Sequence, residues 1–375
     1  MAWLRKRGGR AVGLVASTAM ALALTACNSG GSGGREPEGR EAKYQRVIED
    51  PHPRPADVIE MAGAPYGVAR AGDGSLLLTY EADNVEDDEG PAATAWRIVG
   101  PDGRTVAEHA EHANAEDVPP AFKGMGEGFV RVPQEETAWT LDVRGKRHKA
   151  VLTETPSSTR PGDILLTELE PTLVYRPATR TVAPPAGVPD DAISLAVDER
   201  GTAWSLDQPL TEKPHRVVWQ RDARTLGSVA VPKPYTGGAL AARGGTAALS
   251  LIQDESVRGL LMTTDDGAHW RTVLAGGIAW KDLKNGPEAL VLELLTDGRL
   301  LVGEEGGRFW LADDRTNSAF RELKTPARFT SFTVDGTTLY GIVDATTSTY
   351  DLVNGEGLWI SRDGGSEWQR YEARG

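Results

Sequence analysis

Two eight-residue stretches decide the fold: residues 263–270 read TTDDGAHW and residues 361–368 read SRDGGSEW. Both fit the pattern Ser/Thr-x-Asp-x-Gly-x-x-Trp, with the shared positions at Thr263, Asp265, Gly267, Trp270, Ser361, Asp363, Gly365 and Trp368. In such a segment the hydroxyl and carboxylate hydrogen-bond the backbone of their own turn, glycine adopts a left-handed conformation, and tryptophan covers apolar surface. The two stretches therefore predict structural turns between strands rather than catalytic acids.

The sequence around these stretches repeats. An aromatic residue, or once a leucine, anchors a short extended run seven times, at Trp96, Trp139, Tyr175, Trp219, Leu261, Trp310 and Trp359. Neighbouring anchors are 36 to 49 residues apart. A period of ~40–50 residues containing four short strands is typical of a β-propeller blade.

Glycine-containing pairs that suit tight hairpins precede six of the seven anchors, at residues 73–74, 127–128, 200–201, 244–245, 297–298 and 335–336. We place these pairs between the first and second strands of each blade. The sequence thus predicts an all-β fold, a seven-bladed β-propeller of four-stranded antiparallel blades over residues 44–375, with six or eight blades as alternatives. Residues 44–47 either help to close the ring as a strand or belong to a linker.

The two eight-residue stretches resemble the Asp box, or BNR repeat, of sialidases and other propellers. The resemblance implies that both turns join the third and fourth strands, on the face opposite the usual ligand site. The face that carries the usual ligand site is called the wide face below. Sialidases also carry an arginine on the first inner strand. Gly67 stands at the equivalent position here, which weakens the sialidase interpretation.

The N-terminus carries a targeting signal. Four bases within residues 5–10 precede an uncharged run over residues 11–26, which is too short to span a bilayer and suits a secretory signal. The run ends in Leu24-Thr25-Ala26-Cys27, and Cys27 is the only cysteine. This resembles the lipobox of bacterial lipoproteins, which implies removal of residues 1–26 and a diacylglyceryl group on Cys27; an ordinary signal peptide is the alternative.

Residues 27–43 are rich in Gly, Ser and Glu and predict a flexible tether. We therefore expect the protein at the cell membrane, lipid-anchored on its extracytoplasmic side. Cleavage lowers the net charge from −13 to −17 because it removes four bases and no acids. The acidic balance, with no basic block expected beyond the N-terminus, disfavours nucleic-acid binding, and one cysteine excludes a disulfide framework.

Candidate binding residues lie in two long connections on the wide face, residues 81–94 and 108–120. They are Glu81, Asp83, Asp87, Asp88, His109 and His112. We hypothesise an acidic patch for a cationic or hydroxyl-rich ligand, or for calcium. The alternative is a pair of solubilising loops. On a strand, His109 and Glu111 would share one face and His112 would lie on the other, but a polar loop is the favoured interpretation.

These patterns predict no catalytic residue, resident metal or other cofactor. The anchor tryptophans are expected in the core between blades, whereas Trp204 and Trp280 fall outside the series and are candidates for ligand contact. We expect a monomeric binding or scaffold module for a protein, glycan or cell-wall ligand on the wide face. The alternative is a glycan-active hydrolase of sialidase-like architecture.

Overall fold

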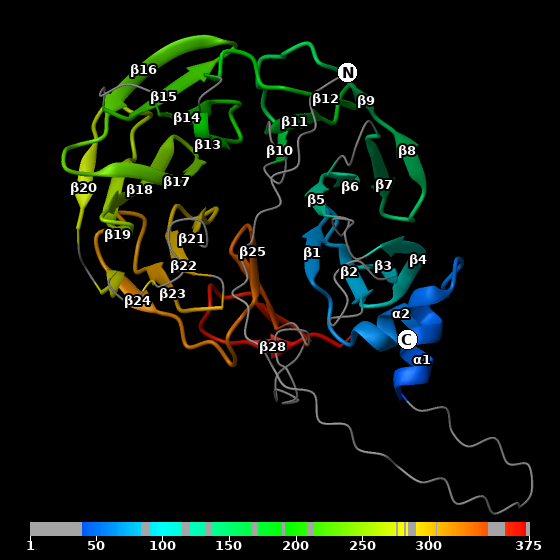
Figure 1. Cartoon of the computed structure of the whole chain (residues 1–375). Coiled ribbons are helices and arrows are strands. Elements are labelled where there is room, and N and C mark those ends of the chain that lie inside the picture. Colours follow the sequence, from blue (N-terminus) through cyan, green and yellow to red (C-terminus); the bar gives the residue numbers. More distant parts are fainter. Residues whose placement is uncertain are drawn as a thin grey trace, which may run out of the picture.

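The computed structural model describes residues 40–83, 91–114, 121–132, 137–166, 172–189, 192–208, 214–274, 277–280, 283, 290–304, 306–343 and 357–372. Seven four-stranded sheets follow one another around a ring, each with one edge strand nearest the middle (Figure 1). The predicted seven-bladed, all-β propeller is confirmed.

Blades 1 and 2 consist of β1 (Gly67–Arg70), β2 (Leu76–Asp83), β3 (Pro91–Val99), β4 (Thr105–Asn114), β5 (Phe122–Met125), β6 (Gly128–Arg131), β7 (Trp139–Asp142) and β8 (Arg147–Lys149). Blades 3 and 4 consist of β9 (Val151–Leu152), β10 (Ile164–Leu166), β11 (Leu173–Arg176), β12 (Thr181–Ala183), β13 (Ala192–Val197), β14 (Ala203–Asp207), β15 (Arg216–Arg221) and β16 (Arg224–Ala230).

Blades 5 and 6 consist of β17 (Thr236–Arg243), β18 (Thr246–Gln253), β19 (Ser256–Thr263), β20 (Arg271–Val273), β21 (Leu290–Leu294), β22 (Leu300–Glu304), β23 (Phe309–Ala312) and β24 (Phe320–Glu322). Blade 7 consists of β25 (Ser331–Asp335), β26 (Thr338–Val343), β27 (Gly357–Ser361) and β28 (Gln369–Arg370).

The predicted hairpin pairs lie at or beside the turn between the first two strands of six blades. Gly244 and Gly245 are the clearest case, because together they form the two-residue connection between β17 and β18. Their φ angles are +58° and +80°, a conformation that residues with a Cβ adopt at a cost.

Blade 3 departs from the predicted antiparallel pattern. Its outer strand, β9, precedes the other three strands in sequence and pairs parallel to β12. The anchor Tyr175 consequently lies in the second strand of its blade, whereas the other six anchors lie in the third strand. This rearrangement explains why the third repeat is short and lacks a hairpin pair.

The apolar core lies between blades. Six clusters of buried side chains each join two neighbouring blades, and they include the anchors Trp96, Trp139, Tyr175, Trp219, Leu261 and Trp310. Between blades 3 and 4 the described contacts are polar: the Thr159 hydroxyl donates to the Gly201 carbonyl at 2.8 Å, and the Gln220 amide donates to the Ala186 carbonyl at 2.9 Å. The prediction that the anchor tryptophans form an inter-blade core is confirmed.

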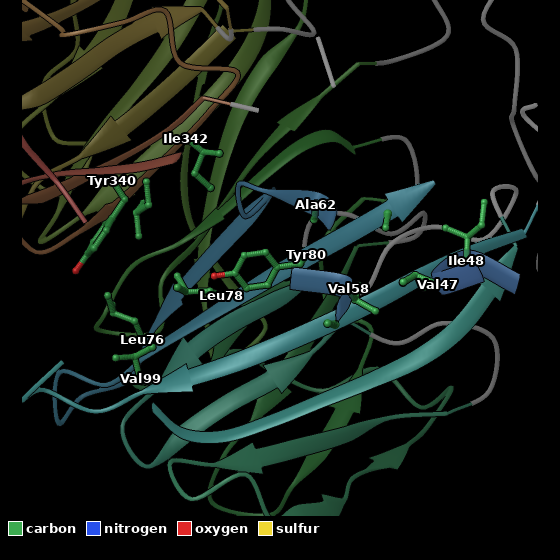
Figure 2. Packing of buried hydrophobic residues seen from close by; sticks show 14 of the residues in the cluster. Val47, Ile48, Val58, Ala62, Leu76, Leu78, Tyr80, Val99, Tyr340 and Ile342 are labelled. Atoms are coloured by element: carbon green, nitrogen blue, oxygen red, sulfur yellow. The ribbon is translucent and has the colours of Figure 1, made fainter. Parts of the chain in front are cut away.

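Two helices precede the ring, α1 (Arg40–Glu49) and α2 (Pro55–Ala62). Val47, Ile48, Val58 and Ala62 pack on β2 and β3 of blade 1 and belong to the apolar cluster that blade 1 shares with blade 7, where the ring closes (Figure 2). Residues 44–47 are therefore neither a strand nor a linker, and α1 includes residues 40–43, which the sequence had placed in the tether. Among the described residues, no helix is long and apolar enough to cross a membrane.

The packing of α1 predicts that Ile48→Ala destabilises the whole ring. Ile48 is completely buried where α1 packs on blade 1, in the cluster that blade 1 shares with blade 7, so the variant loses buried surface and leaves a cavity. We expect the free energy of unfolding to fall by about 2–5 kcal/mol in urea titrations. Gln45→Ala, on the exposed side of the same helix, is the matched control and is expected to change it by less than about 0.5 kcal/mol. Equal effects of the two variants would contradict this role for α1.

Candidate functional site

Blade 1 presents a row of polar side chains to blade 2 at the wide-face ends of its strands. The strand register pairs Glu81 with Thr94 and Thr94 with Glu111, so these three residues lie side by side on one face of the sheet. The next row of the same face holds Thr79, Trp96 and His109. Directly cross-strand residues share a face, so the acids here belong to extended strands rather than to the loops that the sequence predicted.

Glu111 lies beside basic side chains from both blades. Its carboxylate lies 3.8 Å from His109 Nε2 and 3.6 Å from Arg131 Nη2 of blade 2. The His109 ring, aided by Arg131, holds the pKa of Glu111 below its ordinary value although partial burial opposes this. Burial in turn lowers the pKa of Arg131. Glu111 is thus held ionised, the opposite of what a general acid for glycoside hydrolysis requires.

Trp139 of blade 2 contacts the two arginines that face the acids of blade 1. The guanidinium carbon of Arg147 lies 3.8 Å from the centre of the Trp139 ring, and that of Arg131 lies 5.1 Å from it. Cations at these distances are attracted to the face of an indole ring. The two arginines are therefore held in fixed positions opposite the acids of blade 1.

Tyr66, just before β1, belongs to the same group of polar side chains between blades 1 and 2. Its side chain hydrogen-bonds Thr79 and lies within electrostatic range of Glu81, Glu111 and Arg131. Burial is the main reason that its pKa is raised. We call Tyr66, Glu81, His109, Glu111, Arg131, Trp139 and Arg147 the blade 1–2 seam.

The structure places the predicted binding residues unevenly. Glu81 and His109 belong to the seam, while His112 is exposed on the other face of β4, as a strand requires. Residues 87 and 88, the Asp83 side chain and Cys27 lie outside the part of the chain that the structure describes. Within the described residues, no group of three or more His, Cys, Asp or Glu side chains is arranged to hold a metal.

Charged side chains also converge on the middle of the ring. Glu293 of β21 and Lys123 of β5 lie in blades 6 and 2, on opposite sides, yet they interact electrostatically, and Arg243 of β17 joins them. Glu293 is solvent-exposed, but the surrounding blades desolvate its carboxyl group and raise its pKa. Arg70 of β1 pairs with Asp335 of β25 at the junction of blades 1 and 7.

The two Ser/Thr-Asp turns lie at the opposite face, between β19 and β20 and between β27 and β28. In the first turn, the Gly267 N–H donates to the Thr263 hydroxyl at 3.1 Å, and the His269 N–H donates to Asp265 at 2.9 Å. In the second turn, equivalent bonds reach Ser361 at 2.7 Å and Asp363 at 3.0 Å.

The tryptophans of these turns are structural as well. The Trp270 ring lies 5.7 Å from Trp219, and the Trp368 ring lies 5.0 Å from Phe329. Together with the backbone hydrogen bonds, these contacts give the positions shared by the two stretches a role in holding the turn against the core.

Two interpretations of the sequence were wrong. Trp204 and Trp280 do not contact ligand from an open surface: Trp204 is fully buried and stacks on Trp219 at 5.4 Å, and the Trp280 indole N–H donates to the Leu274 carbonyl at 3.1 Å. A basic block does occur beyond the N-terminus, because residues 144–149 read RGKRHK. Counting the charged residues within a short window along the sequence would have found this basic block.

The chain matches no protein-family model and no curated protein. Among solved structures, it is similar to a puromycin-hydrolysing peptidase of Mycobacterium tuberculosis, with 15% identity and a TM-score of 0.48 over 87% of this chain and 56% of that one. It is also similar to BamB from Moraxella catarrhalis, with 10% identity and a TM-score of 0.36 over 74% of this chain and 81% of that one. YCF48 bound to D1 peptide gives 14% identity and a TM-score of 0.30 over 50% of this chain and 70% of that one. At these values, what those proteins bind or cleave does not transfer to this chain.

The hydrogen bonds of the first turn predict a carboxyl pKa that NMR can check. The His269 side chain is the main reason that the pKa of Asp265 falls to about 2. Because this pKa is lower in the folded than in the unfolded chain, the interaction stabilises the fold at neutral pH and is lost as the pH falls toward 2. In His269→Ala we expect the pKa of Asp265 to rise toward its ordinary value of 3.8 in a carboxyl-carbon titration. Asp363, held by its own turn, is the internal control, and an unmoved Asp265 would contradict the assignment.

Proposed function

We propose that this chain is a lipid-anchored β-propeller on the extracytoplasmic side of the cell membrane, which binds a protein, glycan or cell-wall partner on its wide face. The observation that carries the binding role is the blade 1–2 seam. It combines acids, bases and a tyrosine whose positions are fixed by strand register and by stacking on Trp139.

Rigid polar groups favour recognition because the conformational entropy of their side chains is lost during folding, so little more is lost when a partner binds. The seam lies where β2 and β4 end and where connections to the next strand leave the sheet, so a partner can approach it from the wide face. The anchor is supported by the lipobox-like residues 24–27 and by the tether composition that follows them.

The anchor is tested by Cys27→Ser. Intact mass spectrometry of the membrane fraction is expected to show a chain that starts at residue 27 and carries a diacylglyceryl group, and the variant is expected to lose that mass and leave the membrane fraction. A Cys27→Ser chain that stays fully membrane-bound and equally processed would contradict lipidation. Ser366→Ala, at an exposed position of the ring that leaves the N-terminus intact, is the control.

The binding face is tested by photo-crosslinking in cells. A photoreactive amino acid at His109, an exposed residue of the blade 1–2 seam on β4, is expected to give discrete adducts with a protein or a glycan. The same probe at Ser366, exposed on the opposite face, is the matched control and is expected to give none. Identical adducts from both sites, or adducts from Ser366 alone, would contradict a working wide face.

A second candidate function, glycan hydrolysis, is favoured by Glu293. Its pKa is raised and its side chain is exposed toward the middle of the ring, which are properties of a general acid. If the chain hydrolyses glycosides, Glu293→Gln is expected to abolish turnover of a fluorogenic glycoside panel and Glu367→Gln, on the opposite face, to preserve it. Equal turnover by both variants would remove Glu293 from consideration.

A further inference from the structure

One basic edge stands out on an otherwise acidic protein. Arg144, Lys146, Arg147 and Lys149 lie on the turn between β7 and β8 and on β8 itself, and all four side chains are exposed. The whole chain has a net charge of −13. We call these four residues the blade 2 edge.

The structure holds the blade 2 edge in a defined shape. Asp142 accepts hydrogen bonds from the backbone N–H groups of Arg144 and Lys146, both at 2.9 Å, and its second oxygen lies 3.2 Å from His148 Nε2. Arg147 stacks on Trp139. The only acid of this hairpin is therefore engaged in building the turn, and the bases project from a rigid support.

The position of the blade 2 edge relates it to the N-terminus. β8 is the outermost strand of blade 2, and α1 packs beside the neighbouring blade 1, so both lie on the same side of the rim (Figure 1). The acids of the intervening strand β4 are largely neutralised: Glu108 lies 2.5 Å from Arg97 Nε, and Glu111 pairs with Arg131. Arg46 of α1 and Arg104 of the β3–β4 turn are exposed on this side as well, but the blade 2 edge is the hairpin that gathers four exposed bases around a single acid that is engaged in its own turn.

We propose that the blade 2 edge docks on anionic lipid headgroups of the membrane to which Cys27 is attached. The proposal rests on the proposed function for its geometry: residues 28–39, between Cys27 and α1, span at most ~43 Å when extended and ~20 Å on average. This side of the rim is thus held within reach of the lipid surface. A basic edge there would direct the acidic part of the propeller away from the membrane. The rim of the ring would then contact the lipid surface, and the wide face would remain accessible to a partner.

A lipid surface is favoured over a soluble partner because the attraction of the basic edge to anionic headgroups adds to the attachment through the acyl anchor on Cys27. A basic residue close to an anionic bilayer strengthens binding by about fivefold, and an acyl anchor supplies the second attachment. Four bases on one rigid hairpin, on the same side of the rim as the origin of the tether, match that arrangement.

The test uses the chain from residue 27 onward with Cys27→Ser, which keeps every described element and does not depend on lipidation. Sedimentation with vesicles of phosphatidylcholine alone, or with one quarter phosphatidylglycerol, is measured at low and high salt. We expect binding to the anionic vesicles only, lost at high salt. The variant with Arg144, Lys146, Arg147 and Lys149 all changed to Gln is expected to bind at least about tenfold more weakly.

Two further variants make the result specific. The control changes Arg224, Arg258, Lys324 and Arg328 to Gln, which removes the same charge from exposed positions on other parts of the ring, and we expect a loss of at most about twofold. A triple variant that keeps Arg147 tests whether loss of its stacking on Trp139, rather than loss of charge, explains the result.

Equal loss in the blade 2 edge variant and in the control would overturn the proposal, as would equal binding to neutral and anionic vesicles. Tight binding to a soluble polyanion such as polyglutamate, with none to vesicles, would overturn it in favour of an acidic macromolecule. Failure of lipidation in cells would refute the anchor and leave the vesicle result standing, so the two failures are distinguishable.

Discussion

Apolar surface buried between neighbouring blades is the interaction on which the rest of this structure depends. A four-stranded blade has two apolar faces and cannot cover either alone, so each blade needs a neighbour on both sides. Apolar clusters fill six of the seven junctions, polar contacts join blades 3 and 4, and at the junction of blades 7 and 1 the cluster also includes residues of α1 and α2. The ring closes through packing, since every strand of blades 1 and 7 comes from its own stretch of chain.

The same packing builds the polar face. Blade 1 turns one side of β2, β3 and β4 toward blade 2, and along that side the register runs from Leu77 and Ile98 in the core to Glu81 and Glu111 at the wide-face end. On the facing side of blade 2, Phe129 of β6 lies in the core and Arg131 lies two residues further along the same strand. Burial of the apolar halves thus brings the charged halves together and holds them at fixed positions.

Much of this architecture could be predicted because its signals are local. Hairpin glycines, the spacing of the anchors and the two Ser/Thr-Asp turns each depend on a few adjacent residues. The helices could not be predicted, because the value of burying Ile48 depends on the apolar face that blade 1 offers to α1, which the largely polar sequence of that helix does not reveal. Residues 108–114 were expected to form a loop because most of their side chains are polar. In the structure they belong to strand β4, and two of their acids pair with arginines, Glu108 with Arg97 and Glu111 with Arg131. Trp204 was misassigned because burial between blades has no signature outside the anchor series.

Ring closure is the central claim, and amide hydrogen exchange tests it most directly. In a closed ring, the peptides covering residues 76–82 and 339–343, which face each other across the last junction, exchange as slowly as residues 246–251 in the interior of the ring. Exchange of both junction peptides within seconds, while residues 246–251 stay protected, would show an open ring and contradict the account.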